Sequence, residues 1–92
     1  MEIKTEVRKY IAKNFLLDAP EATIEDAMPL ITGGVIDSLG MIVLIAFLER
    51  RFEVEFMPRE IDVHCLDTVE RINELLLKKL ASRDAAFAPG NQ

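Results

Sequence analysis

The stretch DSLGMIVLIAFLERRF, residues 37–52, decides the fold of this 92-residue chain. It contains no proline and a single glycine, Gly40, so a helix is predicted from Ser38 to Phe52. Four of its residues recur at helical spacing and are expected to enter a core: Met41, Ile45, Leu48 and Phe52. Because residues 41–48 are apolar without a break, the helix is either deeply buried or carries a binding surface. We expect its other face to dock a partner.

Further helices are predicted on both sides of this stretch. A first helix is indicated by apolar residues at steps of three and four, namely Ile3, Val7, Tyr10, Ile11 and Phe15. A last helix is indicated in the same way by Val69, Ile72, Leu75, Leu76 and Leu80. Asp67 and Glu70 have the spacing of a capping box, with Asp67 as the N-cap of the last helix. Pro58 is predicted to open a short helical turn that ends near Asp62, because proline suits a first helical position.

The segment between the first two helices, residues 17–37, is predicted to be a long loop. Pro20, Pro29 and the pair Gly33-Gly34 interrupt it, but its apolar residues argue that it packs against the helices. The fold class is therefore all-α: a four-helix bundle of three main helices and a short third helix, with a long loop between helices one and two. We expect one domain over residues 1–81 and a disordered tail over 82–92.

Composition and charge exclude several classes of function. Sixteen acidic residues oppose eleven basic ones, so the net charge of −5 disfavours nucleic acid as a partner. The acidic residues gather in the middle of the chain, which suits docking on basic partners and equally suits simple solubility. The single cysteine, Cys65, excludes an internal disulfide and a multi-cysteine zinc site, and together with a start unlike a secretory signal it predicts a cytoplasmic protein. No apolar run is long enough for a membrane span, which needs about twenty residues.

The candidate functional residue is Ser38, which follows the flexible approach Gly33–Ile36 and Asp37. On one interpretation Ser38 only caps the helix, a role that Asp37 could also fill. On the other, the helix N-terminus stabilises a phosphate through its free N–H groups and the positive end of its dipole. Ser38 could then carry a phosphodiester, provided that its hydroxyl lies on the surface. A short Asp-Ser-Leu string does not by itself decide between the two.

The arrangement of the whole chain, from about residue 3 to residue 80, resembles an acyl carrier protein. That family forms a four-helix bundle with a long first loop and an Asp-Ser-Leu motif at the start of the second helix, which residues 37–39 match. Residues 48–52, Leu-Glu-Arg-Arg-Phe, are similar to the family's close of helix two. Pro58 and residues 67–69 match the entries to helices three and four.

The resemblance implies that Ser38 accepts 4'-phosphopantetheine from coenzyme A, that Asp37 assists the phosphopantetheinyl transferase with its metal-bound coenzyme A, and that Leu39 helps the transferase dock. The thiol of the arm would hold acyl intermediates as thioesters for acyl-loading and acyl-processing enzymes of a fatty acid, polyketide or related specialised pathway. The chain itself would then be no enzyme and would hold no metal. His64 and Cys65 are adjacent and do not converge on one point, so surface or core roles are expected for both.

Departures from the family pattern concern the choice of partner. Fatty-acid carriers usually have an acidic residue after Asp-Ser-Leu and more acids along the helix, whereas this chain has Gly40 and Val43. We therefore expect an apolar docking face, less sensitive to salt, and a dedicated pathway rather than the housekeeping fatty-acid synthase. The expected face consists of Leu39, Val43, Ala46, Phe47 and Arg50.

Two alternatives stay open on the sequence. Candidates to line a cleft that shelters an acyl chain are Leu44, Ile61, Leu66 and Ile72, although ordinary core packing is the expected role of each. The alternative function is a small helical interaction module that is never modified and binds a partner helix through its second helix. A monomer is expected in either case.

Overall fold

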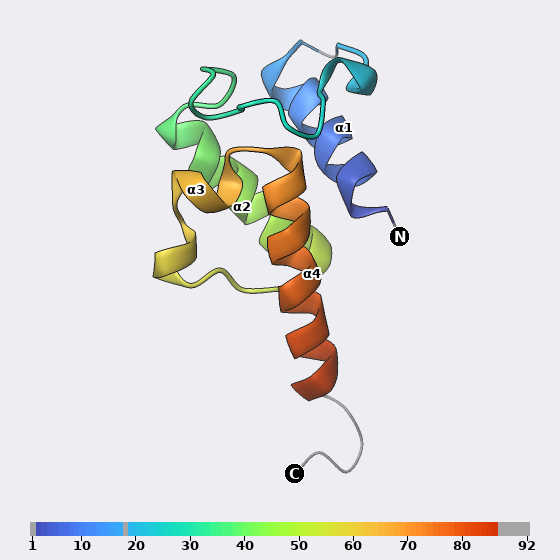
Figure 1. Ribbon diagram of the computed structural model, residues 1–92, viewed down its shortest axis with the longest axis vertical. Helices are drawn as coiled ribbons and strands as arrows, with labels where there is room; N and C mark the ends of the chain where they lie inside the picture. The colour runs from blue at the N-terminus through green and yellow to red at the C-terminus, as the bar shows by residue number, and fades with distance from the viewer. Residues whose placement is uncertain (1, 18, 87–92) are drawn as a thin grey trace.

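The computed structural model describes residues 2–17 and 19–86, and within these ranges the chain is helical and contains no strand. The main helices are α1 (Ile3–Phe15), α2 (Ser38–Phe52) and α4 (Val69–Ala86), and a short α3 (Val63–Leu66) precedes the last (Figure 1). Two single 3-10 turns, η1 (Glu21–Thr23) and η2 (Pro58–Glu60), lie between them. The predicted fold class, a four-helix bundle with a long first loop, is confirmed.

One apolar core joins the three main helices. The predicted stripes supply most of it, since the following residues are buried: Ile3, Val7 and Ile11 of α1, Ile45, Leu48 and Phe52 of α2, and Val69, Ile72 and Leu76 of α4. Met41 and Leu75 are partly buried at its edge. Helical periodicity therefore identified these faces correctly. Each Å² of apolar surface that is buried stabilises the fold by about 25 cal/mol, and this gain holds each helix in place.

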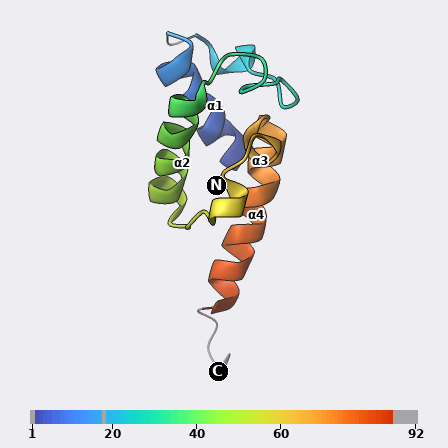
Figure 2. The same cartoon turned by 90° about the vertical axis from the view of Figure 1, so that its left-hand side faces the viewer.

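The described part of the long loop, residues 19–37, covers one end of the bundle in both views (Figures 1 and 2). Ile24, Leu30 and Ile36 bury their side chains in the core, as the sequence predicted. Asp26 adds polar contacts, because its carboxylate pairs with Lys4, at 2.8 Å, and with Arg8 of α1. Residues 19–37 are thus packed against the helices, as the sequence predicted.

The helical turn predicted at Pro58 forms as η2, whereas the α-helical turn α3 lies further along the chain. Pro58 opens η2, which ends at Glu60, and α3 begins only after Asp62. Asp62 is extended, and its carboxylate accepts a hydrogen bond from the His64 N–H at 3.0 Å, so it caps α3 and ends the preceding turn. Ile61, expected in the core, is 41% exposed because it falls between the two helical turns.

The predicted capping box at the start of α4 is wrong. Thr68 takes the capping role, because its hydroxyl accepts a hydrogen bond from the Arg71 N–H at 3.1 Å. The Asp67 carboxylate points instead to the long loop. At its other end α4 continues to Ala86, beyond the predicted domain limit at residue 81, and it projects past the other helices (Figure 1). The first residues of the predicted disordered tail are therefore helical, and residues 87–92 lie outside the described residues.

None of the helices in the described ranges has the length and apolar character that crossing a bilayer requires.

Candidate functional site

Asp37, not Ser38, caps the N-terminus of α2. Its backbone is extended, with φ −88° and ψ −177°, and its Oδ1 accepts a hydrogen bond from the Gly40 N–H at 2.7 Å. Its carbonyl oxygen also accepts the first helical bond, from the Met41 N–H at 2.8 Å. The interpretation of Ser38 as the cap is therefore wrong, and Ser38 is the first residue inside the helix.

The Ser38 side chain is exposed, and its hydroxyl forms no hydrogen bond with any residue that the structure describes. The backbone N–H groups of Ser38 and Leu39 likewise have no acceptor in that part of the chain, since the Asp37 carboxylate takes only the third N–H of the helix. A phosphate joined to Ser38 Oγ would meet these donors and the positive end of the helix dipole. The residues present therefore fit a phosphodiester on Ser38.

The start of α2 lies close against the end of α1. Gly40 is buried, and a Cβ atom at this position would lie 2.8 Å from Cε1 of Phe15 and 3.0 Å from Cγ2 of Ile36. From the sequence, Gly40 was interpreted as a docking position at which the acidic residue of the family pattern is missing. The structure shows instead that Gly40 faces inward, where a side chain would force α2 away from α1.

The approach to Ser38 forms a closed turn. The Ile36 N–H donates to the Leu30 carbonyl at 2.9 Å, which ties together the two ends of residues 30–36. Within this turn Gly34 adopts φ +84°, a conformation that favours glycine. A Cβ at Gly33 would lie only 2.2 Å from the Pro29 carbonyl oxygen, so this position is also restricted to glycine.

Asp67 anchors the same turn, which sequence reasoning missed. Its Oδ1 accepts hydrogen bonds from the N–H groups of Ile31 and Thr32, at 2.8 and 2.9 Å, and its Oδ2 accepts one from the Thr32 hydroxyl at 2.8 Å. Burial of Asp67 acts to raise the pKa of its carboxyl, but the hydrogen bonds from Thr32 and Ile31 and the charge of Arg71 hold that pKa below its ordinary value. Asp67 is therefore an ionised, nearly buried anchor.

The outer face of α2 is apolar next to Ser38. Leu39 is 71% exposed and Val43 47%, and Ala46 and Arg50 are exposed further along. Ile42, which the sequence analysis did not select, is 59% exposed beside them. We refer to Leu39, Ile42, Val43, Ala46 and Arg50 as the outer α2 face. Ile42 lies three residues after Leu39, so helical spacing would have placed both residues on the same face.

Phe47, the remaining predicted docking residue, is less exposed than the residues of the outer α2 face. Its ring is half-buried and stacks on Tyr10 of α1 with 3.8 Å between ring centroids. Packing between α1 and α2 thus occupies one side of this ring.

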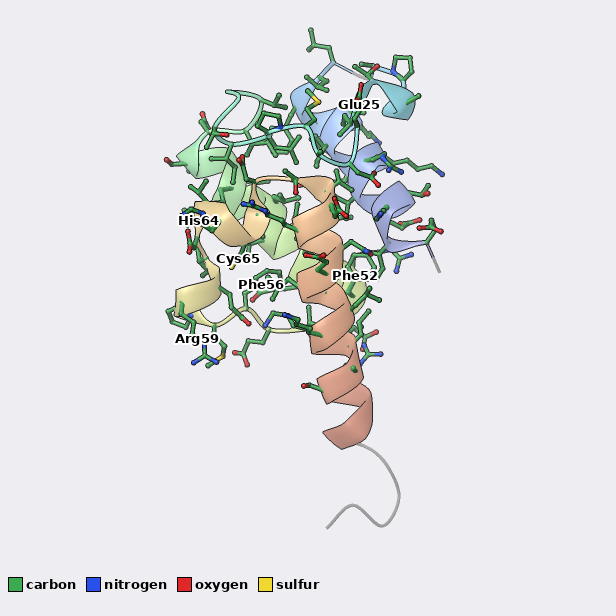
Figure 3. All side chains as sticks on the ribbon, in the orientation of Figure 1. Glu25, Phe52, Phe56, Arg59, His64 and Cys65 are labelled. Atoms are coloured by element: carbon green, nitrogen blue, oxygen red, sulfur yellow. The ribbon has the colours of Figure 1, made fainter. Side chains whose placement is uncertain are left out.

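His64 and Cys65 both come from α3 (Figure 3). His64 is exposed, whereas Cys65 is partly buried against the core. Among the residues that the structure describes, no three His, Cys, Asp or Glu side chains are grouped so as to hold a metal ion.

Comparison with known proteins identifies the family. No model of a known protein family matches the chain. The chain is similar to the D-alanyl carrier protein of Streptococcus sanguinis (strain SK36) and to the D-alanyl carrier protein of Streptococcus mutans serotype c (strain ATCC 700610 / UA159). Each is 35% identical over 74 residues, which cover 80% of this chain and 90% of the relative. The chain therefore belongs to the family of small carrier proteins, which are not enzymes and bear a covalent 4'-phosphopantetheine arm.

Proposed function

We propose that Ser38 is the attachment site of the phosphopantetheine arm. The observation that carries the proposal is the free, exposed Ser38 hydroxyl at a helix start whose cap is supplied by its neighbour. In the transfer, Ser38 Oγ forms a bond to the phosphorus that bears the pantetheine arm of coenzyme A and loses its proton. The bond from that phosphorus to the nucleotide breaks, and adenosine 3',5'-bisphosphate leaves.

Asp37 and Leu39 serve the transferase in this proposal. The Asp37 carboxylate is exposed and uses Oδ1 for the cap, which leaves Oδ2 for the metal-bound coenzyme A that the transferase presents. Leu39 places an exposed apolar side chain directly beside Ser38 and provides a docking contact. The outer α2 face continues this contact and receives the enzymes that load and unload the arm.

The cargo in this proposal is a single amino acid, D-alanine, held as a thioester on the arm. Similarity to two D-alanyl carrier proteins over most of the chain supports this cargo in place of a fatty acyl or polyketide chain. The packing of the core agrees with a small cargo, because Leu44, Leu66 and Ile72, candidates for an acyl-chain cleft, have no exposed surface. A small polar group on the arm needs no such shelter.

Intact mass spectrometry tests the attachment site. The purified protein is incubated with coenzyme A and a broad-specificity phosphopantetheinyl transferase, and we expect it to gain the mass of one arm. Ser38→Ala is expected to abolish the gain, whereas Ser82→Ala, which alters an exposed serine of α4, leaves it intact. A wild-type protein that stays unmodified, or an arm on Ser38→Ala, would refute the proposal.

The cargo is tested on protein isolated from its own cell. We expect the intact mass to show the arm plus one alanine residue, and hydroxylamine to release that addition because it is a thioester. Chiral chromatography of the alanine released from a second sample by mild alkaline hydrolysis of the thioester is expected to give the D enantiomer. A longer acyl group, or L-alanine, would contradict the assigned cargo and would leave the attachment site standing.

A further inference from the structure

Asp67 is the buried ionisable residue of the described chain, being 9% exposed, and its contacts are concentrated on one short segment. Besides the three hydrogen bonds to its carboxylate, its carbonyl oxygen accepts one from the Leu30 N–H at 2.6 Å. One residue between α3 and α4 thus binds three consecutive residues of the long loop, 30–32. A buried carboxylate with this many partners fixes the segment firmly, because charge-assisted hydrogen bonds are stronger than neutral ones.

The bound segment leads directly to the start of α2. Leu30 is fully buried and its carbonyl accepts the hydrogen bond from Ile36, which is fully buried as well. Only Asp37 separates Ile36 from Ser38, and Asp37 is itself held by the Gly40 N–H. A continuous series of short contacts therefore runs from Asp67 through Leu30 and Ile36 to the end of α2 that bears Ser38.

From this connection we infer that Asp67 is a positioning residue for the modification of Ser38, an inference that rests on the proposed attachment site. By holding residues 30–32 against the α3–α4 corner, Asp67 sets where the exposed turn at Thr32–Gly34 and the Ser38 hydroxyl lie relative to each other. An enzyme that modifies Ser38 therefore meets the turn and the Ser38 hydroxyl in a single relative arrangement. Without the anchor the turn samples other positions, and the fraction of encounters with a correct geometry falls.

The test compares Asp67→Ala with Thr68→Ala. The two neighbouring substitutions each remove a side chain that accepts backbone hydrogen bonds, but the Thr68 side chain caps α4 and forms no hydrogen bond with the described part of the long loop. Both variants are assayed where circular dichroism shows them folded, with coenzyme A and a broad-specificity transferase. We expect kcat/KM for Asp67→Ala to fall on the order of tenfold to a hundredfold, as displacements of about 1 Å do in other sites. Thr68→Ala is expected to stay within about twofold of wild type, because the lost hydrogen bond belongs to α4 and not to the loop that leads to Ser38.

Hydrogen exchange supplies a second measurement, which distinguishes local loosening of the turn from a general loss of stability. In Asp67→Ala the amides of Ile31, Thr32 and Ile36 are expected to exchange faster while those of α4 keep their protection. Asp67→Asn retains an oxygen for the two backbone donors and is expected to restore part of the modification rate. Equal rates for Asp67→Ala and Thr68→Ala, or unchanged protection of the turn, would overturn the positioning role while wild type is still modified. Failure of wild type itself to accept the arm would overturn the proposed attachment site and this inference together.

Discussion

The rings of Tyr10 and Phe47 lie face to face, with an angle of 11° between their planes. Phe15 completes the group by meeting Tyr10 edge-on at a centroid distance of 6.3 Å. These rings join the second half of α1 to the middle of α2, and Phe15 also lies against Gly40. The aromatic group therefore fixes α2 relative to α1 a short distance from Ser38.

Loss of the Phe47 ring should destabilise the fold rather than only weaken partner docking. We expect Phe47→Ala to lower the free energy of unfolding by about 2 kcal/mol, somewhat less than the roughly 3–5 kcal/mol for a fully buried phenylalanine, because the ring is only half-buried. Urea denaturation followed by circular dichroism measures the change. Val43→Ala, on the outer α2 face, is the matched control and should stay within about 0.5 kcal/mol of wild type. Equal stability of the two variants would show that the stack contributes nothing.

Gly40→Ala tests the close approach of α1 and α2. Alanine favours the helix by about 1 kcal/mol, but overpacking a close contact costs about 1–3 kcal/mol. A net loss on the order of 1 kcal/mol in the free energy of unfolding is therefore expected, since the new Cβ would meet the Phe15 ring and Ile36. In a Phe15→Ala background the shortest of these contacts is removed, and the same substitution should cost less than in wild type. If Gly40→Ala stabilises both backgrounds, Gly40 and Phe15 do not lie in close contact.

Acid should weaken the Asp67 anchor. The pKa of this carboxyl is lowered in the folded state, so the stability it provides is present above its unfolded pKa of about 3.9 and is lost as the pH falls through the folded value. We expect the free energy of unfolding of wild type to decline more steeply than that of Asp67→Asn once the pH drops below about 5. Denaturation curves at stepped pH give both slopes. Parallel slopes would mean that the anchor does not titrate as an ionised group.

The outer α2 face should bind through apolar contact more than through charge. We expect modification of Ser38 to slow by no more than a few-fold between low and physiological salt, because screening weakens charge pairs and hardly affects apolar burial. Val43→Asp should reduce kcat/KM strongly, since it places a carboxylate in that contact. Leu77→Asp makes the same kind of change at an exposed position of α4 and serves as the control. A steep salt dependence together with normal activity of Val43→Asp would contradict an apolar docking face.

The sequence identified the three main helices because their apolar periodicity extends over several turns. Burial of that face outweighs local preferences, so Val7, Leu48 and Leu76 are all fully buried where the spacing placed them. The sequence predicted the turn at Pro58 but not the separate α3, because a single turn contains too few residues for a period to emerge. In this region both Pro58 and Asp62 are suited to begin a helix, and the α-helix begins after Asp62.

Interactions between distant segments escaped prediction. Asp67 and Glu70 have the spacing of a cap, but the backbone N–H groups of Ile31 and Thr32 compete for the same carboxylate, and only the folded chain brings them near. Local sequence likewise could not show that Gly40 faces Phe15. The candidate residue Ser38 could be found because its motif is contiguous, whereas the residues that hold it in place come from three parts of the chain.

The hydrogen bonds between Thr32 and Asp67 span 35 positions of sequence. During synthesis the ribosome must therefore make and release the segment around residue 67 before the corner beside Ser38 can close, and contacts of this range form late because long loops are entropically slow to close. A nascent chain that ends after α2 would display the Asp-Ser-Leu motif without its support. Attachment of the arm should consequently follow translation, and a premature stop codon in the α3 region should leave fragments that are poor acceptors even though they contain the serine.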